Sequence, residues 1–148
     1  MLSPLLSYIS HFRRFYARQF EPAAAKYGLS QLEIDILLFL HNNPERNTAR
    51  DIVEMRGFAK SNVSNAVESL RQKGYLAAEP DPGSRKMRRL TLRQEMGGRT
   101  DELAALQSAV FTKIFQGFSA GERKALCEFH KRIDQNLLSA LDKNERTR

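Results

Sequence analysis

Hydrophobic residues recur at helical spacing over most of this chain, and the clearest case is residues 60–73. Apolar side chains there fall at i, i+3, i+4 and i+7, which predicts a helix with one buried face and one solvent-exposed face. The buried stripe comprises Val63, Ala66, Val67 and Leu70. The opposite face comprises Ser61, Asn65, Glu68 and Gln72, with Asn62 and Ser64 on its flanks. Gly74 predicts the end of this helix.

Two shorter helices are predicted before it, each from a capping signature. Ser30 and Glu33 have the spacing of a capping box, and they open a helix that ends near residues 42–44. Its inward residues are Ile34, Leu37 and Leu38. Thr48 and Asp51 form a second, box-like start for a short helix through residue 55. Gly57 then turns the chain toward the helix at 60–73.

The stretch that follows Gly74 changes from helical spacing to strands. Residues 75–79 and 87–92 are each predicted as a short strand. The connection, residues 80–84, contains two prolines and a glycine, which predict an irregular loop of fixed shape.

Both ends of the chain carry long amphipathic stripes. The N-terminal stripe comprises Leu2, Leu5, Leu6, Ile9, Phe12, Tyr16 and Phe20, with a ragged end expected at Pro22 and Gly28. The C-terminal stripes comprise Leu103, Leu106, Val110, Phe111, Ile114, Phe115 and Phe118, then Leu126, Phe129, Ile133, Leu137 and Leu141 after a cap at residues 119–122. A central unit of roughly seventy residues cannot cover these stripes, so a homodimer is predicted. The alternative is that the three helices pack on one another within a monomer.

Charge is concentrated near the central helix. Of the net charge of +7 over 148 residues, five units lie between Lys60 and Arg93, which hold eight basic and three acidic residues. A local basic patch of this kind indicates polyanion binding, although a solvated charged face is the alternative. Hydrophobic content of 41% is ample for a core.

These elements predict a mainly α fold with a small β-hairpin wing, in which a winged helix-turn-helix is flanked by N- and C-terminal dimerisation helices. The expected divisions are residues 1–28 for the N-terminal dimerisation helix, 29–98 for the DNA-binding unit and 99–148 for the C-terminal dimerisation helices. In a helix-turn-helix, the N-terminal residues of the second helix contact base edges in the major groove.

Over about residues 29–106 the chain resembles the MarR family of bacterial winged-helix regulators. The resemblance is carried by Leu29-Ser30-Gln31, Ile52-Val53-Glu54, Gly57-Phe58, Lys60-Ser61-Asn62-Val63-Ser64, Leu70-Arg71-Gln72-Lys73-Gly74-Tyr75-Leu76, Asp81-Pro82-Gly83-Ser84-Arg85-Lys86 and Leu90-Thr91-Leu92. It implies an obligate homodimer, joined through the terminal helices, that binds pseudo-palindromic promoter sites. Many similar proteins are released from DNA by small, often phenolic, ligands.

Four features depart from the family pattern. Ala59 stands where a capping Ser is usual, Asn65 where an arginine often lies, and Ser84 where the wing usually has a second aspartate. The junction at residues 93–97 is one residue longer than usual. Losing the cap commonly costs about 1 kcal/mol, and losing the arginine removes a guanine-reading group and implies a different operator.

The predicted DNA contacts are Lys60, Ser61, Asn62, Ser64 and Asn65 on the helix and Arg85, Lys86, Arg88 and Arg89 on the wing. Ser61 and Asn65 are expected to read bases. Lys60, Arg88 and Arg89 are expected to contact phosphates. Arg85 is expected to enter a narrow A·T-rich minor groove. The alternative for Arg85, an ion pair with Asp81, does not exclude that contact.

An effector pocket is expected between the dimerisation helices and the winged unit, for a small aromatic ligand. Its candidate lining residues are Tyr8, His11, Phe12, Tyr16 and Phe39. The alternative is plain core packing, because an aromatic stripe at helical spacing is often core.

The remaining chemistry of the chain argues against other function classes. We find no catalytic or cofactor-binding motif, so neither an enzyme nor a cofactor is expected. The single cysteine, Cys127, excludes an internal disulfide, fits a cytoplasmic location and is predicted to be a buried, inert thiol rather than a redox sensor. His11, His41 and His130 are scattered, so no metal site is expected. No membrane span or secretory signal is predicted.

The sequence therefore predicts a sequence-specific DNA-binding transcriptional regulator, acting as a homodimer and expected to be a repressor. Activation of transcription is the alternative, because the direction of the effect depends on where the operator lies relative to the promoter. The competing class is a non-DNA-binding helical adaptor or a protein-binding winged helix.

Overall fold

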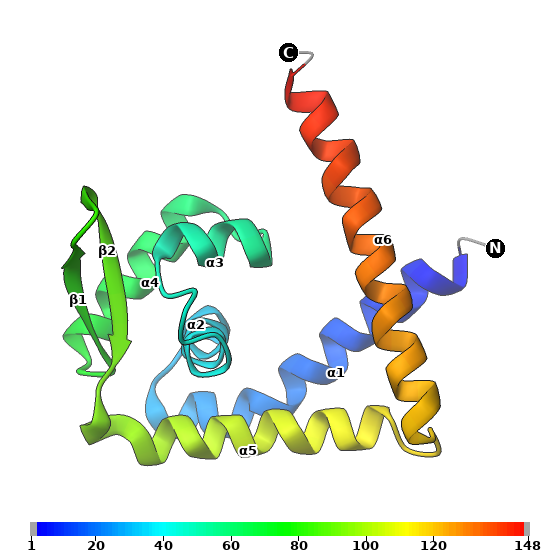
Figure 1. Ribbon diagram of the computed structural model, residues 1–148. Helices are drawn as coiled ribbons and strands as arrows, with labels where there is room; N and C mark the ends of the chain where they lie inside the picture. Colours follow the sequence, from blue (N-terminus) through cyan, green and yellow to red (C-terminus); the bar gives the residue numbers. More distant parts are fainter. Residues whose placement is uncertain (1–2, 147–148) are drawn as a thin grey trace. The chain divides into compact units, whose positions relative to one another are not determined.

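The computed structural model describes residues 3–146 (Figure 1). Its elements, in order, are α1 (Ser3–Tyr27), α2 (Gln31–Asn42), α3 (Ala49–Arg56), α4 (Lys60–Gln72), β1 (Leu76–Asp81), β2 (Ser84–Leu92), a 3-10 turn (Gln94–Met96), α5 (Gly97–Ile114) and α6 (Ala120–Arg146). The chain forms two compact units, Met1–Val110 and Phe111–Arg148, whose boundary falls within α5. The mainly α fold with one β-hairpin agrees with the sequence prediction.

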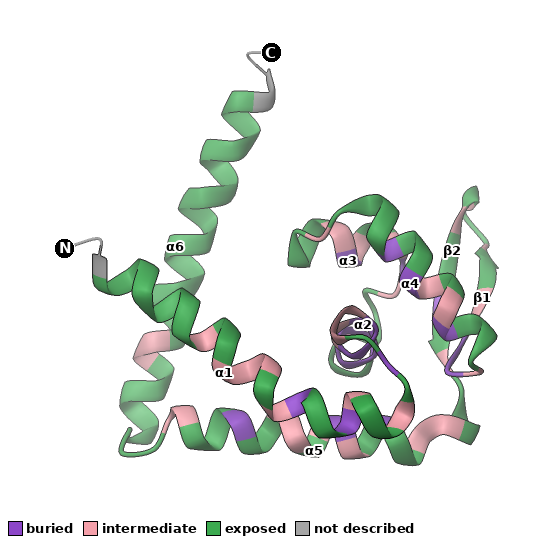
Figure 2. Cartoon of the chain, turned by 180° about the vertical axis from the view of Figure 1, so that it is seen from behind, coloured by how far each residue is buried: buried purple, intermediate pink, exposed green. Residues whose placement is uncertain are grey.

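The core of the first unit is built around α2, which packs between α1 and α4 (Figure 2). The predicted inward residues Ile34, Leu37 and Leu38 are buried, and so are Ile36, Phe39 and Leu40. A helix that is apolar on every side must be enclosed by other elements. The helix therefore serves as the central support on which α4 and the hairpin are mounted.

Both capping boxes predicted in this unit are present. The Ser30 hydroxyl accepts a hydrogen bond from the Glu33 amide at 3.1 Å, and the Glu33 carboxylate accepts one from the Ser30 amide at 2.8 Å. Thr48 and Asp51 make the same reciprocal pair at the start of α3, with both distances 3.1 Å. Gly57 ends α3 in the left-handed conformation, with φ of 67°.

The N-terminal helix is more regular than its sequence predicts. It continues through Pro22 to Tyr27 and ends where Gly28 takes a positive φ of 63°. A proline removes a single amide donor from the helix, and the buried side chains of Phe20 and Ala23 hold the helix against the core on either side of it. Leu2 of the predicted stripe lies outside the described residues.

The hairpin is also longer than predicted. β1 and β2 pair antiparallel from Leu76 opposite Leu92 to Asp81 opposite Ser84, with an irregular register between Pro80 and Asp81. The prediction of an irregular loop over residues 80–84 is therefore wrong. In a two-stranded ribbon each strand is an edge, so a proline without an amide donor is tolerated.

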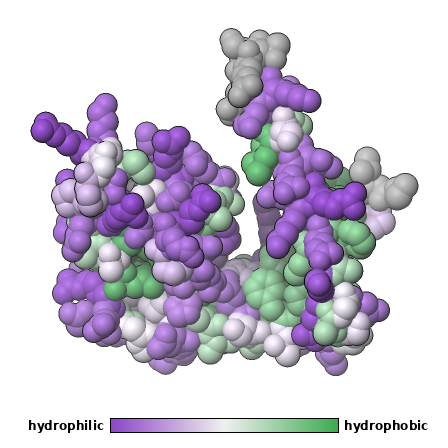
Figure 3. Space-filling model, viewed as in Figure 1, coloured by the Kyte–Doolittle hydropathy of each residue, from purple (hydrophilic) through white to green (hydrophobic). Residues whose placement is uncertain are grey.

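The second unit consists of the end of α5 and the long helix α6. Its capping box is formed by Ser119 and Glu122, as predicted, with distances of 2.7 and 3.2 Å. Nearly every residue of α6 is exposed, and hydrophobic patches interrupt its polar surface (Figure 3). Cys127 is exposed as well, so its predicted burial is wrong, because α6 is exposed along nearly all of its described length.

Candidate nucleic-acid interface

The core fixes the orientation of α4 in the first unit. Val63 and Leu70 are fully buried and Ala66 is nearly so, as the apolar stripe predicts, while Val67 is half-buried. These residues belong to the same cluster as the buried side chains of α2. The opposite face of α4 is therefore held toward solvent.

That exposed face carries small, neutral, hydrogen-bonding side chains near its N-terminal end. Ser61, Asn62, Ser64 and Asn65 are all exposed, as is Lys60 at the start of the helix. Ala59 is the N-cap and offers no side-chain acceptor, as expected. The structure thus brings together all five helix residues that the sequence predicts for DNA contact.

Glu68 is the acidic residue on this side of α4, and its carboxylate accepts hydrogen bonds from two side chains of the same helix. The Arg71 guanidinium donates to it at 2.9 and 2.7 Å, and Gln72 donates at 3.1 Å. The hydrogen bond from Arg71 lowers the pKa of Glu68. Glu68 is therefore ionised and held by its own helix.

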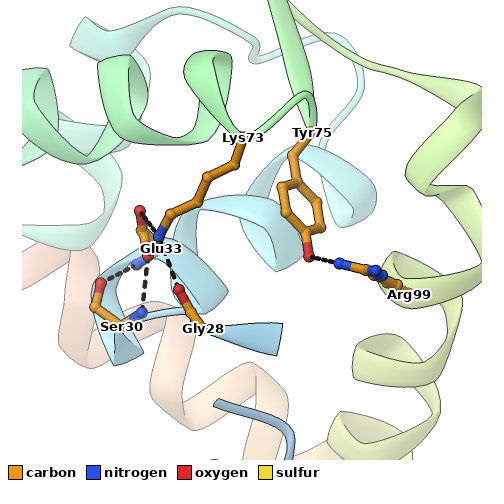
Figure 4. Close-up of polar contacts among 6 residues, drawn as sticks. All are labelled: Gly28, Ser30, Glu33, Lys73, Tyr75 and Arg99. Atoms are coloured by element: carbon orange, nitrogen blue, oxygen red, sulfur yellow. Dashed lines mark hydrogen bonds and ion pairs between the residues drawn. The ribbon is translucent and has the colours of Figure 1, made fainter. Parts of the chain in front are cut away.

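The C-terminal end of α4 is tied to the start of α2 (Figure 4). The Lys73 ammonium lies 3.0 Å from both carboxylate oxygens of Glu33 and donates to the Gly28 carbonyl at 2.8 Å. Burial opposes the ionisation of Glu33, but hydrogen bonds from Ser69, the Ser30 amide and Lys73 outweigh it, so the pKa of Glu33 is lowered. No local sequence pattern predicts this contact, because Glu33 and Lys73 are forty residues apart in the chain.

A second connection fixes the residue that follows the turn at Gly74, where φ is 82°. Tyr75 is buried, and its hydroxyl accepts a hydrogen bond from Arg99 at 3.1 Å (Figure 4). Arg99 also stacks over the Tyr27 ring, 4.8 Å from its centroid. The Tyr27 hydroxyl donates to Glu102, and this hydrogen bond lowers the pKa of Glu102. The wing and α4 are therefore anchored to the end of α1 and the start of α5.

The basic patch divides into paired and unpaired residues. Arg71, Lys73, Arg89 and Arg93 form ion pairs with acidic side chains. Among the residues that the structure describes, Lys60, Arg85, Lys86 and Arg88 make no ion pair, and all four are exposed. The cations that remain available to a polyanion lie at the start of α4 and along β2.

Asp81 partners Arg89 rather than Arg85. The Arg89 guanidinium donates to Asp81 at 2.7 Å and to the Asn47 side chain at 3.1 Å. The alternative of an ion pair between Arg85 and Asp81 is therefore wrong. The register places Arg89 opposite Glu79, two residues before Asp81 on β1, and from there its guanidinium reaches Asp81. Arg89 nonetheless keeps about half of its side chain exposed, and its phosphate contact remains a prediction.

Two clefts border α4. One, of about 330 Å³, lies between α4, the start of α3 and the wing, and its lining includes Ser64, Lys86 and Arg88. The other, of about 520 Å³, faces the start of α2, and its lining includes Asn62 and Asn65. The predicted base-reading face is thus flanked by open space on both sides.

Three of the residues predicted to line an effector pocket, Tyr8, Phe12 and Tyr16, form an aromatic column along α1 together with Phe20. Successive rings in this column have centroid separations of 6.4, 5.5 and 4.8 Å, and only the middle pair, Phe12 and Tyr16, is stacked. His11 is exposed and Phe39 is buried in the core. Tyr16 accepts a hydrogen bond from Gln107 at 2.9 Å, and burial raises the pKa of its phenol. The clefts described above are lined by other residues, so the effector pocket remains a prediction.

No group of three or more metal-ligating side chains occurs within the described part of the chain. None of the helices described is long and apolar enough to span a bilayer.

Comparison with known proteins agrees with this geometry. The sequence model of the MarR family matches residues 27–87, the segment that holds α2, α3, α4 and most of the wing. The winged-helix part of this chain is therefore similar to the MarR family.

Several solved structures share its fold at low sequence identity. The crystal structure of the transcriptional regulator PA3341 superposes with a TM-score of 0.79 and 19% identity, covering 94% of this chain and 99% of that one. A MarR transcriptional regulator from Methanosarcina mazei Go1 gives 0.77 and 16%, covering 93% and 99%. BpsR of Bordetella bronchiseptica gives 0.68 and 17%, covering 88% and 98%. No curated protein matches the chain by sequence.

Proposed function

We propose that this protein is a homodimeric repressor of the MarR family that binds a pseudo-palindromic operator through α4 and the wing, and that a small aromatic ligand releases it. The observation that carries the proposal is the exposed face of α4. It combines small hydrogen-bonding side chains with unpaired cations at the start of the helix and on the neighbouring strand β2, and the other face of the helix is buried in the core.

In this proposal each part of the interface has its own task. Ser61, Asn62, Ser64 and Asn65 face base edges in the major groove. Lys60, Lys86, Arg88 and Arg89 contact phosphates, which supply affinity without sequence preference. Arg85 at the hairpin turn reaches the minor groove. No catalytic step or cofactor is part of this function.

Dimer formation is supported by apolar surface within each unit. Leu5, Leu6 and Ile9 of α1 are 41–67% exposed, and the α6 residues Phe129, Ile133, Leu137, Leu138 and Leu141 are 48–58% exposed. Burial of apolar surface contributes about 25 cal/mol per Å², so a second copy of the chain that covers these faces would gain substantially. The dimerisation segments remain residues 1–28 and 99–148.

Ligand release is supported by the aromatic column of α1 and by one relative. BpsR is described as regulated in DNA binding by 6-hydroxynicotinic acid. In our proposal a comparable aromatic acid binds near Tyr8, His11, Phe12, Tyr16 and Phe39. It can release DNA only if it binds more tightly to a dimer whose two α4 helices have the wrong spacing.

The test begins with sedimentation equilibrium at micromolar concentration, where we expect twice the 16.9 kDa mass of one chain. Selection from a random DNA pool should then return two inverted half-sites about 10 bp apart, centre to centre. A mass of one chain in sedimentation equilibrium contradicts the dimer. The absence of any selected DNA sequence contradicts the operator function. Salicylate and related acids are titrated last, with loss of the protein–DNA complex as the expected result.

Repression is tested separately, by in vitro transcription from a promoter that overlaps the selected site. Lower transcript yield on addition of the protein supports repression, and higher yield contradicts it.

A further inference from the structure

Two asparagines occupy the centre of the predicted base-reading face. Asn62 and Asn65 lie three residues apart on α4, so their side chains project from the same side of the helix, about 5–6 Å apart at Cβ. Both are exposed and both border the cleft of about 520 Å³. Within the described residues, neither carboxamide makes a hydrogen bond to another side chain or to the backbone.

A free carboxamide has a specific hydrogen-bonding pattern. Its oxygen accepts and its NH2 group donates, and the adenine edge in the major groove offers the complementary N6 donor and N7 acceptor. Three residues advance a helix by about 4.5 Å, whereas base pairs are stacked about 3.4 Å apart. Two asparagines at this spacing can therefore address adenines at nearby base pairs of one half-site.

Guanine requires a different partner, which this face of α4 does not offer. Arginine or lysine reads guanine through its O6 and N7 acceptors. Arg71 is held by Glu68 at 2.7 Å and lies near the far end of the helix, and Lys73 is held by Glu33 at 3.0 Å. Lys60 carries a flexible point charge at the first turn, which suits a phosphate.

This face of α4 also lacks a free group that would recognise cytosine. Its N4 amino group is read by a carboxylate, and Glu68 is the carboxylate on this side of α4. Arg71 and Gln72 already occupy its oxygens at 2.7–3.1 Å.

We propose that Asn62 and Asn65 determine specificity by reading adenines in the major groove, so that each half-site presents A·T pairs to the N-terminal half of α4. This inference rests on the proposed DNA-binding function and names its ligand class. The unpaired Arg85 agrees with it, because a guanidinium favours the narrow minor groove of A·T-rich DNA.

The test uses the full-length protein and the half-site selected from a random pool. Each adenine of that half-site is replaced in turn by 7-deazaadenine, which removes the N7 acceptor and leaves base pairing intact. Fluorescence anisotropy is measured at fixed salt. At one position the modified base should weaken DNA binding by the parent protein about 5-fold or more, which is the effect of one lost hydrogen bond. The Asn65→Ala variant should bind the unmodified DNA and the DNA with 7-deazaadenine at that position equally.

A second variant keeps the test informative. Asn65→Arg should change the selected base at one position from adenine to guanine. Lys60→Ala is the matched control, since it should weaken all sequences alike and leave the sensitivity to 7-deazaadenine unchanged. Circular dichroism confirms that each variant is folded.

The outcomes separate this inference from the proposed function. Selected half-sites with guanine under α4, or equal sensitivity of the parent and Asn65→Ala to 7-deazaadenine, overturn adenine reading while DNA binding stands. Binding that shows no sequence preference overturns both.

Discussion

The ammonium of Lys73 lies 3.0 Å from each carboxylate oxygen of Glu33, forty residues earlier in the chain. The Glu33 side chain is almost fully buried, whereas that of Lys73 is 38% exposed. Lys73 is the C-cap residue of α4, so this pair sets how the proposed recognition helix sits on α2. It is a positioning contact and does not itself face DNA.

Replacing Lys73 by Met should destabilise the protein by about 1–3 kcal/mol, because it leaves a buried carboxylate with fewer partners. The measurement is urea denaturation at one fixed protein concentration, since dimerisation would couple stability to concentration. Arg50→Met is the matched control. It breaks an ion pair whose side chains are 74% and 57% exposed, and should change stability by less than about 0.5 kcal/mol. Equal effects of the two variants would refute the positioning role.

The same pair predicts a pH dependence. Because the folded-state pKa of Glu33 is lowered, its stabilisation is fully present above the unfolded-state pKa of about 4.3. It is lost as the pH falls through the folded-state pKa. Glu33→Gln should therefore be less stable than the parent protein at pH 7, and the difference should shrink toward pH 3. Urea midpoints measured across this range test the prediction, and a constant difference contradicts it.

Local signals in the sequence predicted much of this fold. The boxes at Ser30 and Thr48 involve residues three apart, and the buried stripe of α4 repeats within three turns, so both can be read from neighbours in the chain. The pairing of Lys73 with Glu33 cannot, because many exposed acids are available to a lysine and only the tertiary fold selects one. The same reason applies to Asp81: its neighbours in the sequence suggest Arg85 as a partner, whereas in the folded hairpin its partner is Arg89.

The residue types of the candidate site could be predicted from the sequence, but which of its charged side chains are free to contact DNA could not. The periodicity of α4 placed Asn62 and Asn65 on the exposed face, since the apolar stripe fixed the opposite side. The sequence could not show which cations are unpaired. Arg71 and Lys60 both lie on α4 and both contribute to the basic patch, but only Arg71 forms an ion pair, with Glu68.

A side-chain cap at the start of α4 should stabilise the protein. Ala59 has extended backbone geometry, with φ of −64° and ψ of 133°, which suits an N-cap residue. In Ala59→Ser the hydroxyl can accept a hydrogen bond from an amide of the first turn, so we expect a gain of about 1 kcal/mol in urea denaturation. Ala59→Val provides no acceptor and should give no gain. A gain of the same size in both variants would show that capping is not the cause.

Asp35 on α2 should be a source of instability at neutral pH. Burial raises the pKa of its carboxyl, although a hydrogen bond from Gln31 at 3.0 Å and the charge of Arg56 oppose the shift. Asp35→Asn keeps an acceptor for Gln31 and removes the buried charge, so its melting temperature at pH 7 should exceed that of the parent protein. Because the folded-state pKa is raised, the parent regains stability as the pH falls, and the advantage of the variant should diminish toward pH 4. A variant that is less stable at pH 7 contradicts this.

Arg85 of the wing is exposed and makes no ion pair in the described part of the chain. If it enters an A·T-rich minor groove, replacing the A·T pairs under the wing by G·C should weaken binding, because guanine adds an N2 amino group to that groove. Inosine·cytosine pairs lack this group and should bind like A·T, even though their major-groove edges resemble those of G·C. Arg85→Ala should bind all three DNAs alike, with the slope of log K against log salt lower by about 1. Arg85→Lys should restore the salt slope. Discrimination between inosine·cytosine and A·T by the parent protein would place the wing contact in the major groove instead.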